Sequence, residues 1–389
     1  MLSVSGALAT AVAFGPARMG FGLFVPIFRE QFGLSTALAG TIASGAFGGF
    51  FLALVLTALA IVRVGPRLPV TIGSLFGLLG MGMVAAADGL VLLATGTILA
   101  ATAAGCCWSP FNNAAQRDVP RDRQARMLSI VSTGTTVGVA IAALLAMAMI
   151  GLQQSWRIAW LAFAGFALLS AVFNLLTLRH LARLPHASDQ RTDFRQLIRP
   201  CCMPLYGIAL SFGISSGIYL SFAVDHISAA GGLAGIAPSL AGPVLYAAFG
   251  AGGLVGLLTA EVEYRVGLTS VIRTIFGVSA ASLALIALLP AQWSGVLISG
   301  AMQGMCVMVL SAVFAFWSKR LFPELPTVGL SSVLCMYALG NMLGPIAGGY
   351  IATASNLAVM LLGTGALSLV TAVAFPSQSR RRRREPAYG

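Results

Sequence analysis

Charged side chains are scarce in this sequence, and acidic ones are the scarcest. Asp, Glu, Lys and Arg make up 9% of the 389 residues, and only 11 residues are acidic, whereas a soluble domain carries about 25% charged residues. This shortage excludes a water-soluble globular protein. Hydrophobic residues reach 58% and the mean hydropathy is +0.91. These values together predict an integral membrane protein.

The sequence also lacks the alternation of polar and apolar residues that marks membrane β-barrels. Its apolar runs are continuous, and a helix needs about 20 such residues to cross a bilayer. The expected fold class is therefore an all-α integral membrane protein with twelve transmembrane helices. We expect the spans near residues 3–27, 36–61, 69–87, 90–113, 128–151, 156–178, 201–224, 238–261, 268–289, 293–317, 328–353 and 355–375.

Clusters of reactive or metal-binding side chains are lacking as well. The chain has 3 histidines and 6 cysteines, and no two cysteines form a CxxC pair. His180, His186 and Asp189 form the only such grouping, in a polar loop where solvated side chains are expected. We therefore expect no enzymatic activity, no metal site and no cofactor.

The basic residues are distributed unevenly along the chain, which has a net charge of +12. Arg18 lies within a span, Arg29 and Arg157 flank helix ends, and the other 20 of the 23 Lys and Arg residues fall in every second loop and the C-terminal tail. This pattern follows the positive-inside rule, so we expect no nucleic-acid partner. It predicts a multi-pass protein of the bacterial inner membrane with both termini in the cytoplasm.

One long polar segment separates two sets of six spans, and short motifs recur in both sets. The tripeptide AFG at residues 46–48 returns at 248–250, an offset of 202 (248 − 46). Gly134 and Gly138 match Gly340 and Gly344 at an offset of 206 (340 − 134). Collinear matches at nearly constant offset indicate a duplicated six-helix unit. The expected organisation is an N-terminal bundle (1–178), a cytoplasmic linker (179–200), a C-terminal bundle (201–376) and a basic cytoplasmic tail (377–389).

The loop after the second span reads AxxxVRxGPR over residues 58–67. It resembles the pattern G-x-x-x-D-[RK]-x-G-[RK]-[RK] of the major facilitator superfamily, with Arg63, Gly65 and Arg67 at matching positions. Val62 stands where the family has an acidic residue, so the usual charge lock of the cytoplasmic gate is in doubt. A weaker second copy surrounds Arg265, where two nearby glutamates (Glu261 and Glu263) offer a displaced carboxylate.

Two more segments support the resemblance but depart from the family pattern. The stretch GNMLGPIAGG in the eleventh span, with Gly344 and Pro345, looks like the antiporter motif of the family, which belongs in the fifth span. Close helix packing and a Gly/Pro hinge are both open explanations. The fourth span lacks the arginine of proton-coupled drug antiporters. The form R-x-G-x-G-L-x-x-P around Arg18 is similar to bacterial permeases of the YbfB/YjiJ type.

This resemblance implies a transporter whose two halves rock about a substrate site near the midplane. Arg18 is the residue in greatest need of explanation, because an arginine at the centre of a spanning helix costs about 2.5–3.5 kcal/mol on insertion scales. At 100° per residue, Arg18 shares a stripe with Gly15 and Gly22 and should avoid lipid. Its partner is either a carboxylate or helix carbonyls of the protein, or an anionic substrate, and a gating role is a third option.

Other side chains complete the candidate site. Polar residues at helical spacing occur on the spans that resemble the cavity-lining set of the family, and titratable or hinge residues lie near the predicted gates. The candidates for substrate binding are Arg18, Phe21, Gly22, Asn112, Ser211, Ser215, Tyr219, Gln303, Tyr337 and Asn341. The candidates for coupling or gating are Asp225, His226, Arg63, Gly65, Arg67, Arg265, Gly344 and Pro345.

We therefore expect a monomeric secondary active transporter that moves a small organic anion, such as a carboxylate, with Arg18 as the anion anchor. Its partners are a small-molecule substrate, a candidate coupling proton and the lipid bilayer. The alternative is a proton-coupled efflux antiporter for drugs or metabolites, against which stand the missing arginine of the fourth span and the displaced antiporter motif.

Overall fold

The protein, described by a computed structural model over residues 1–179, 197, 199–322 and 326–375, consists of helices and short connections. Within these residues, twelve helical segments are long and apolar enough to cross a membrane, which confirms the expected fold class. The helices are α1 (Leu2–Phe14), α2 (Pro16–Phe32), α3 (Thr36–Val64), α4 (Arg67–Ala85), α5 (Leu90–Gly105), α6 (Trp108–Asp118), α7 (Arg121–Gly151), α8 (Trp156–Leu178), α9 (Met203–Ala229), α10 (Ala241–Gly253), α11 (Thr259–Val266), α12 (Leu268–Leu288), α13 (Trp293–Leu321), α14 (Pro326–Ala354) and α15 (Leu357–Ala374), with 3₁₀ turns η2 (Pro200–Cys202), η3 (Pro238–Leu240) and η4 (Leu254–Leu258).

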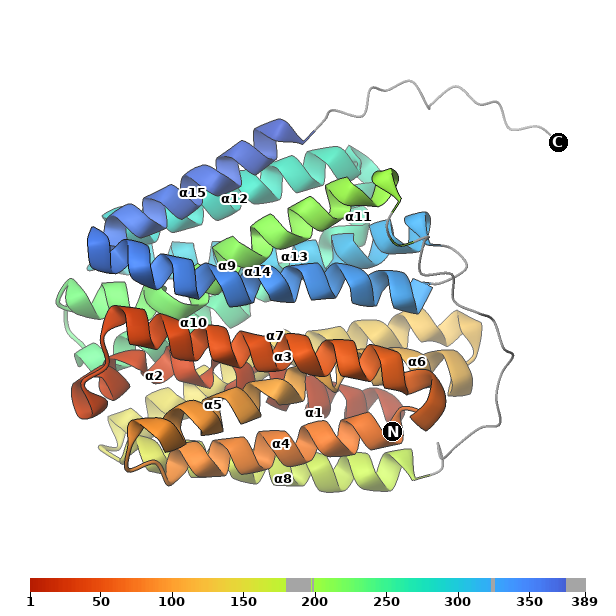
Figure 1. Cartoon of the computed structure of the whole chain (residues 1–389), viewed down its shortest axis with the longest axis horizontal. Helices are drawn as coiled ribbons and strands as arrows, with labels where there is room; N and C mark the ends of the chain where they lie inside the picture. The colour runs from red at the N-terminus through yellow and green to blue at the C-terminus, as the bar shows by residue number, and fades with distance from the viewer. Residues whose placement is uncertain (180–196, 198, 323–325, 376–389) are drawn as a thin grey trace.

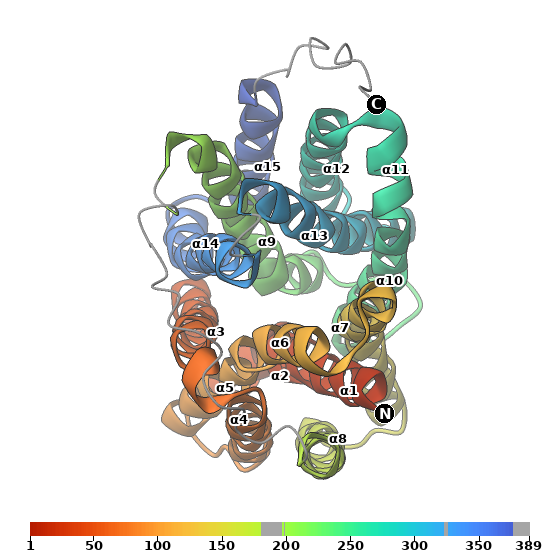
Figure 2. The same cartoon turned by 90° about the vertical axis from the view of Figure 1, so that its right-hand side faces the viewer.

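Helices α1–α8 and α9–α15 form two bundles that lie against each other (Figure 1). The bundles meet where α3 packs on α14 and where α7 packs on α10, and α2 adds a contact with α9. Figure 2 shows the α3–α14 and α7–α10 pairs on opposite sides of the interface. Most of the predicted linker 179–200 and the whole of the predicted tail 377–389 lie outside the described residues.

Glycines let one helix pair in each bundle cross with the backbones in contact. On α7 and on α14, two glycines spaced four residues apart each face a backbone carbonyl group of the neighbouring helix, α1 or α9, and an added Cβ would come closer to it than 3.0 Å. The pairs are Gly134 with Ala7, Gly138 with Ala11, Gly340 with Leu210 and Gly344 with Ile214. The repeat in the sequence therefore corresponds to a repeated helix crossing, and close packing explains both glycine pairs.

These crossings lead to a prediction about stability. Gly340→Ala would press a methyl group on the α9 backbone, and we expect a loss of about 1–3 kcal/mol from overpacking. Gly363→Ala in α15 is the matched control, because no heavy atom lies within 4 Å of its added Cβ and alanine favours a helix by up to about 1 kcal/mol. Thermal unfolding of both variants in detergent measures the difference. Equal melting temperatures would show that the crossing is not tightly packed.

Three spans expected to be continuous helices are interrupted, and the eighth of the chain, predicted over 238–261, changes from α10 to the 3₁₀ turn η4 at Leu254 and back to α-helix in α11. The first span, predicted over 3–27, breaks at Gly15, where α1 ends and Pro16 begins α2. Proline has no N–H to donate to the preceding turn, so the hydrogen-bond ladder is broken just before Arg18. The fourth span, predicted over 90–113, breaks between Gly105 and Trp108. Discontinuous helices of this kind occur around transporter substrate sites.

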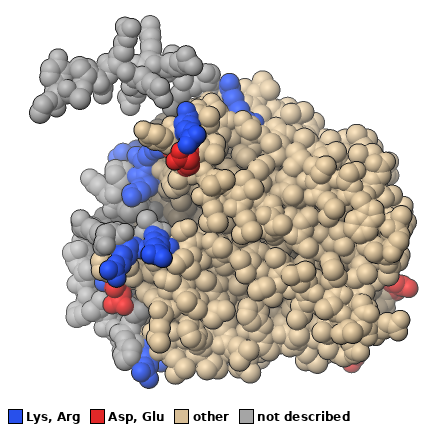
Figure 3. All heavy atoms as spheres, turned by 180° about the vertical axis from the view of Figure 1, so that it is seen from behind, with Lys and Arg blue, Asp and Glu red and all other residues tan. Residues whose placement is uncertain are grey.

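The two ends of the molecule differ in charge. Lys and Arg side chains gather toward one end of the face seen in Figure 3, and a wide uncharged surface separates them from the acidic residues of the other end. We call the end that carries Arg63, Arg67, Arg265 and Arg320 the arginine-rich end. Helix α1 begins at this end and α15 ends there (Figure 1), as expected for an even number of spans.

Candidate functional site

A cavity of about 80 Å³ lies between the two bundles, with helices of both in its wall. Its lining is almost entirely apolar and rich in aromatic rings, and Arg18 is its only charged member. The lining residues are Phe14, Arg18, Met19, Phe50, Leu54, Ala104, Trp108, Thr135, Thr136, Val139, Phe212, Phe249, Val307, Met308, Ser311, Phe314, Leu334 and Tyr337.

The Arg18 guanidinium is surrounded by aromatic rings at this cavity. Its central carbon lies 4.6 Å from the ring centre of Phe50, 5.2 Å from Phe47, 5.5 Å from Phe14 and 5.7 Å from Tyr337. Only 7% of the residue is exposed, so the prediction that it avoids lipid is confirmed. The negative faces of the rings attract a cation and offset part of its desolvation, but they supply no full counter-charge.

Hydrogen bonding of the guanidinium is far from complete. Its Nη2 donates one long bond of 3.4 Å to Oδ1 of Asn341, and its Nε has no partner. Among the described residues no carboxylate lies within ion-pair distance of Arg18, since the four ion pairs found there involve other arginines. A buried charge normally has such a partner. The site therefore contains an unneutralised cation whose hydrogen bonding is incomplete.

Asn341 connects Arg18 to the C-terminal bundle. Its amide nitrogen donates to the carbonyl oxygen of Tyr337 at 2.8 Å, and its Oδ1 also accepts a bond from Ser216 at 3.3 Å. The hydroxyl groups of Ser216 and Tyr337 lie 3.1 Å apart. Of the predicted binding residues, the structure thus brings together Arg18, Tyr337 and Asn341, from α2 and α14. Ser216 belongs to the same network and was not predicted.

Three predicted binding residues of α9 point away from the cavity into the C-terminal bundle. The hydroxyl group of Ser211 lies 2.6 Å from that of Thr371, and Ser215 lies 3.0 Å from Ser368, so both face α15. Tyr219 hydrogen-bonds Ser299 of α13 at 2.9 Å. These hydroxyl groups hold helices together, which is the commoner use of polar residues in membrane helices.

The other predicted binding residues also lie outside the cavity lining. Gln303 is fully buried in α13 and neither of its amide atoms has a partner among the described residues. Phe21 stacks on Phe28 with ring centres 5.8 Å apart, and Asn112 is half-buried in α6, one turn beyond Trp108.

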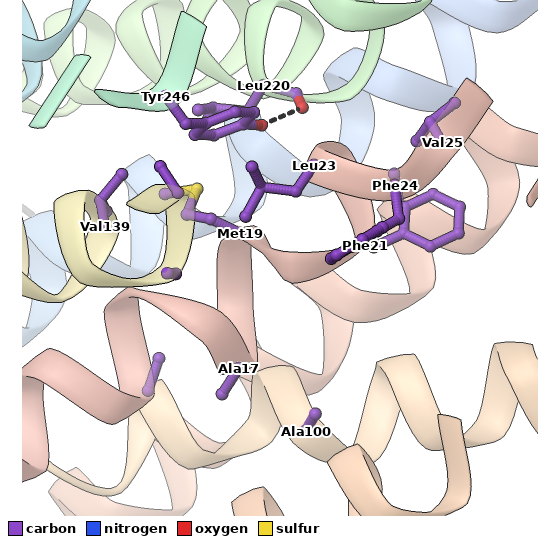
Figure 4. Close-up of a cluster of buried hydrophobic side chains, with 14 of the residues drawn as sticks. Ala17, Met19, Phe21, Leu23, Phe24, Val25, Ala100, Val139, Leu220 and Tyr246 are labelled. Atoms are coloured by element: carbon purple, nitrogen blue, oxygen red, sulfur yellow. Dashed lines mark hydrogen bonds between the residues drawn. The ribbon is translucent and has the colours of Figure 1, made fainter. Parts of the chain in front are cut away.

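Gly22 forms a close crossing of α2 with the C-terminal bundle. An added Cβ would meet the Leu220 carbonyl oxygen at 2.5 Å and would also clash with the Tyr246 hydroxyl group. Figure 4 shows the hydrogen bond from Tyr246 to that carbonyl group beside Met19 and Leu23. Gly22 therefore lets the two halves touch near Arg18.

The predicted gating pair Asp225 and His226 lies near the end opposite the arginine-rich end. Asp225 is buried, at 4% exposure, and pairs with Arg29 at 2.5 Å. This ion pair joins α2 to α9, and so joins the two bundles. His226 instead approaches the carbonyl oxygen of Ala287 in α12 at 3.1 Å. Sequence reasoning treated Arg29 only as a flanking charge and missed its role as the partner of Asp225.

The predicted gate residues at the arginine-rich end follow the two copies of the loop motif. Arg63 and Arg67 are exposed, and Gly65 has φ +72°, a conformation that favours glycine. Arg265 bonds Glu261 one turn earlier in α11 at 2.7 Å, and Glu263 pairs with Arg320 of α13 at 3.0 Å. Both glutamates therefore find partners within the C-terminal bundle.

Pro345 lies inside α14, and its carbonyl oxygen faces Gly40 of α3 in the other bundle.

The cage of aromatic residues around Arg18 was not predicted either. Phe14 precedes Arg18 by one helical turn, a spacing that places the two side chains together and was visible in the sequence. Phe47 and Phe50 come from α3, and no local pattern connects them with Arg18. Only packing of the spans reveals this part of the site.

A cavity with a buried cation between two repeated helix bundles is typical of membrane transporters. A sequence profile of the Major Facilitator Superfamily matches residues 6–263, well over half of the chain. The chain belongs to this superfamily. It is therefore a secondary transporter for a small molecule rather than an enzyme, in a superfamily whose members are often proton-coupled.

Solved structures confirm the fold at low sequence identity. The chain is similar to a bacterial homologue of the human lysosomal transporter Spinster, inward-facing and unoccupied, with a TM-score of 0.75, 18% identity and coverage of 96% of this chain and 95% of that one. It is similar to a POT family transporter in complex with 5-aminolevulinic acid, with a TM-score of 0.77, 13% identity and coverage of 96% of this chain and 94% of that one. It is also similar to the nucleoside transporter NupG, with a TM-score of 0.73, 15% identity and coverage of 96% of this chain and 97% of that one. Comparison with curated protein sequences gives no match.

Proposed function

We propose that this chain is a permease that moves a small organic anion, such as a carboxylate, across the bacterial inner membrane by alternating access, with Arg18 as the anion anchor. One observation carries the proposal: a buried guanidinium faces the central cavity without any carboxylate partner among the described residues. The basic loops support an orientation with both termini in the cytoplasm. The motif around Arg18 supports membership of the YbfB/YjiJ-type branch.

The geometry around Arg18 suits a carboxylate. Aromatic rings surround the guanidinium, but its N–H groups point in the plane of the fork, where Nε is free and Nη2 holds only a long bond to Asn341. A carboxylate accepts two parallel bonds from such an edge. In a cavity of low dielectric constant, that pair strongly favours an anion over a neutral ligand of the same shape.

The same contacts offer a way to connect substrate binding with movement of the two halves. The Arg18–Asn341 bond joins α2 to the C-terminal bundle, and a carboxylate on the guanidinium competes for it. The Arg29–Asp225 ion pair lies eleven residues further along α2, on nearly the same helical face, and joins the halves again. We propose that this pair closes one end of the pathway, while the loops around Gly65 and Arg265 gate the other.

A second candidate function is proton-coupled efflux of drugs or other metabolites. The observation in its favour is the cavity wall, which consists almost wholly of aliphatic and aromatic side chains of the kind that bind apolar compounds. This candidate predicts ligand binding that does not depend on the charge of Arg18, so one experiment separates the two functions.

The deciding measurement is a thermal-shift screen of the purified protein against organic anions, drugs and sugars. We expect carboxylates to raise the melting temperature by several degrees, since a ligand at 100 times its dissociation constant stabilises by about 2.7 kcal/mol. The shift should disappear in Arg18→Gln. Without ligand, Arg18→Gln should be at least as stable as the wild type, because the substitution removes an unneutralised buried charge.

Arg157→Gln is the matched control, because this arginine bonds Asp88 at the end opposite the arginine-rich end, away from the cavity. It should retain the carboxylate shift. Carboxylate shifts that persist in Arg18→Gln would refute the anchor, and drug shifts that persist there would favour the efflux function.

A further inference from the structure

Resting on the proposed anion transport, we infer that the cargo is a monocarboxylate with an aromatic or alicyclic apolar body, rather than a dicarboxylate, a phosphate, an amino acid or a sugar acid. The charge of the cavity, its walls and the engagement of its few hydroxyl groups each point to this class. The cavity of about 80 Å³ is smaller than the cavity of about 150 Å³ that holds benzene, so a ring-sized cargo requires the two bundles to move apart, and a folded or extended peptide is excluded.

The first argument is the balance of charge. Arg18 is the single charged residue in the cavity lining, so it neutralises one negative charge. A second carboxylate or a doubly charged phosphate would leave an excess charge in an apolar enclosure, which costs several kcal/mol. The lining also contains no Asp or Glu. The ammonium group of an amino acid or an organic cation would therefore enter without a counter-ion, next to a positive guanidinium.

The second argument is the chemistry of the walls. Aromatic rings line the cavity from both bundles, with Phe14, Phe50 and Trp108 on one side. On the other side the rings of Phe212 and Tyr337 stack at 5.9 Å, with an angle of 20° between their planes. A flat apolar body between such walls gains both burial and ring contacts. A short hydrophilic carboxylate would leave these walls without a partner.

The third argument concerns the few hydroxyl groups at the cavity. Thr135 donates to the carbonyl oxygen of Ser132 at 2.7 Å, and Thr136 donates to that of Thr133 at 3.0 Å. Both therefore use their protons within α7, and the hydroxyl group of Tyr337 lies 3.1 Å from that of Ser216, which leaves Ser311 as the one lining hydroxyl group without a hydrogen bond among the described residues. A polyhydroxylated ligand needs several donors and acceptors to replace its lost water, and this lining does not provide them.

A matched ligand series on the purified full-length protein tests the inference by isothermal titration calorimetry. Benzoate and cyclohexanecarboxylate carry the inferred features. Terephthalate adds a second charge, benzamide removes the charge, benzylamine reverses it, and lactate removes the apolar body. We expect the first two ligands to bind at least about tenfold more tightly than the other four, because each of the four leaves a charge or an apolar wall uncompensated.

A substitution in the wall provides a second measurement. Ser311→Lys places an additional cation in the lining, and it should raise the affinity for terephthalate relative to benzoate by about tenfold or more. Should this variant fail to fold, the ligand series on the wild type decides alone.

The outcomes separate this inference from the proposed function. Preference for terephthalate that is lost in Arg18→Gln would overturn the single charge of the inferred cargo, and such a preference for lactate would overturn its apolar body. Either result would leave anion transport standing. Equal binding of benzamide and benzoate, unchanged in Arg18→Gln, would overturn both. The absence of binding by every carboxylate in the series would also overturn both.

Discussion

Arg18→Ala should reduce carboxylate uptake into proteoliposomes by about 100-fold or more. The substitution removes both hydrogen bonds to a charged group and the only positive charge in the cavity lining, which together are worth about 3 kcal/mol or more. Arg18→Lys keeps the charge but loses the planar fork, and a lysine is no substitute for arginine at a bidentate site. We expect this variant to remain strongly impaired, at about one-tenth of wild-type uptake or below.

The control for this experiment is again Arg157→Gln, whose uptake should stay close to that of the wild type. Its ion pair with Asp88 is solvent-exposed, with 92% exposure of the Asp88 side chain. Wild-type uptake by both Arg18→Ala and Arg18→Lys would contradict the role of Arg18 as anchor. Equal loss in the Arg157 control would point to a general effect of arginine removal.

Breaking the Arg29–Asp225 ion pair should shift the protein toward states that are open at the end opposite the arginine-rich end. The two single variants should differ in strength. Arg29→Gln leaves the Asp225 carboxylate without a partner at 5% exposure of its side chain. Asp225→Asn leaves the Arg29 cation at 30% exposure, where water can still solvate it. Removal of one partner of a buried pair costs about 3–5 kcal/mol, and partial exposure of Arg29 lowers the cost for Asp225→Asn.

The measurement is the distance distribution between spin labels on α2 and α9 at that end, combined with melting temperatures. We expect Arg29→Gln to open this end further and to lower the melting temperature more than Asp225→Asn does. The double variant should lose less stability than the sum of the losses in the two single variants. Asp88→Asn, at the exposed Arg157 pair, should change neither quantity, since exposed pairs contribute about 0–1 kcal/mol. Unchanged distances in Arg29→Gln would rule out a gate at this position.

Much of the fold could be predicted because the membrane imposes strong local rules. The twelve spans followed from continuous apolar runs, and the repeat followed from motifs such as Gly134 and Gly340, which make equivalent helix crossings. The breaks at Gly15, after Gly105 and at η4 were missed. A proline or glycine in a spanning helix is compatible with a continuous helix whose neighbours satisfy the backbone, so the sequence alone does not decide between them.

The candidate site was predicted less completely. The sequence correctly placed a buried cation at Arg18, yet the polar stripe of Ser211 and Ser215 turned toward α15 instead of the cavity. Helical periodicity tells which residues share a face, but not which neighbour that face meets. Because hydroxyl groups are satisfied equally well by another helix or by a ligand, the same stripe fits both arrangements.

Two conclusions followed from the residues before any packing was known: the chain crosses a membrane in two related sets of helices, and one arginine is buried without an obvious acidic partner. Both conclusions depend on the energetic cost of placing polar groups in hydrocarbon, which acts on each segment separately. The surroundings of Arg18 became visible only in the packed helices: Asn341, which lies 323 residues away, and rings from α1, α3 and α14. These neighbours depend on how the helices rotate and pack against each other, and no local pattern encodes that arrangement.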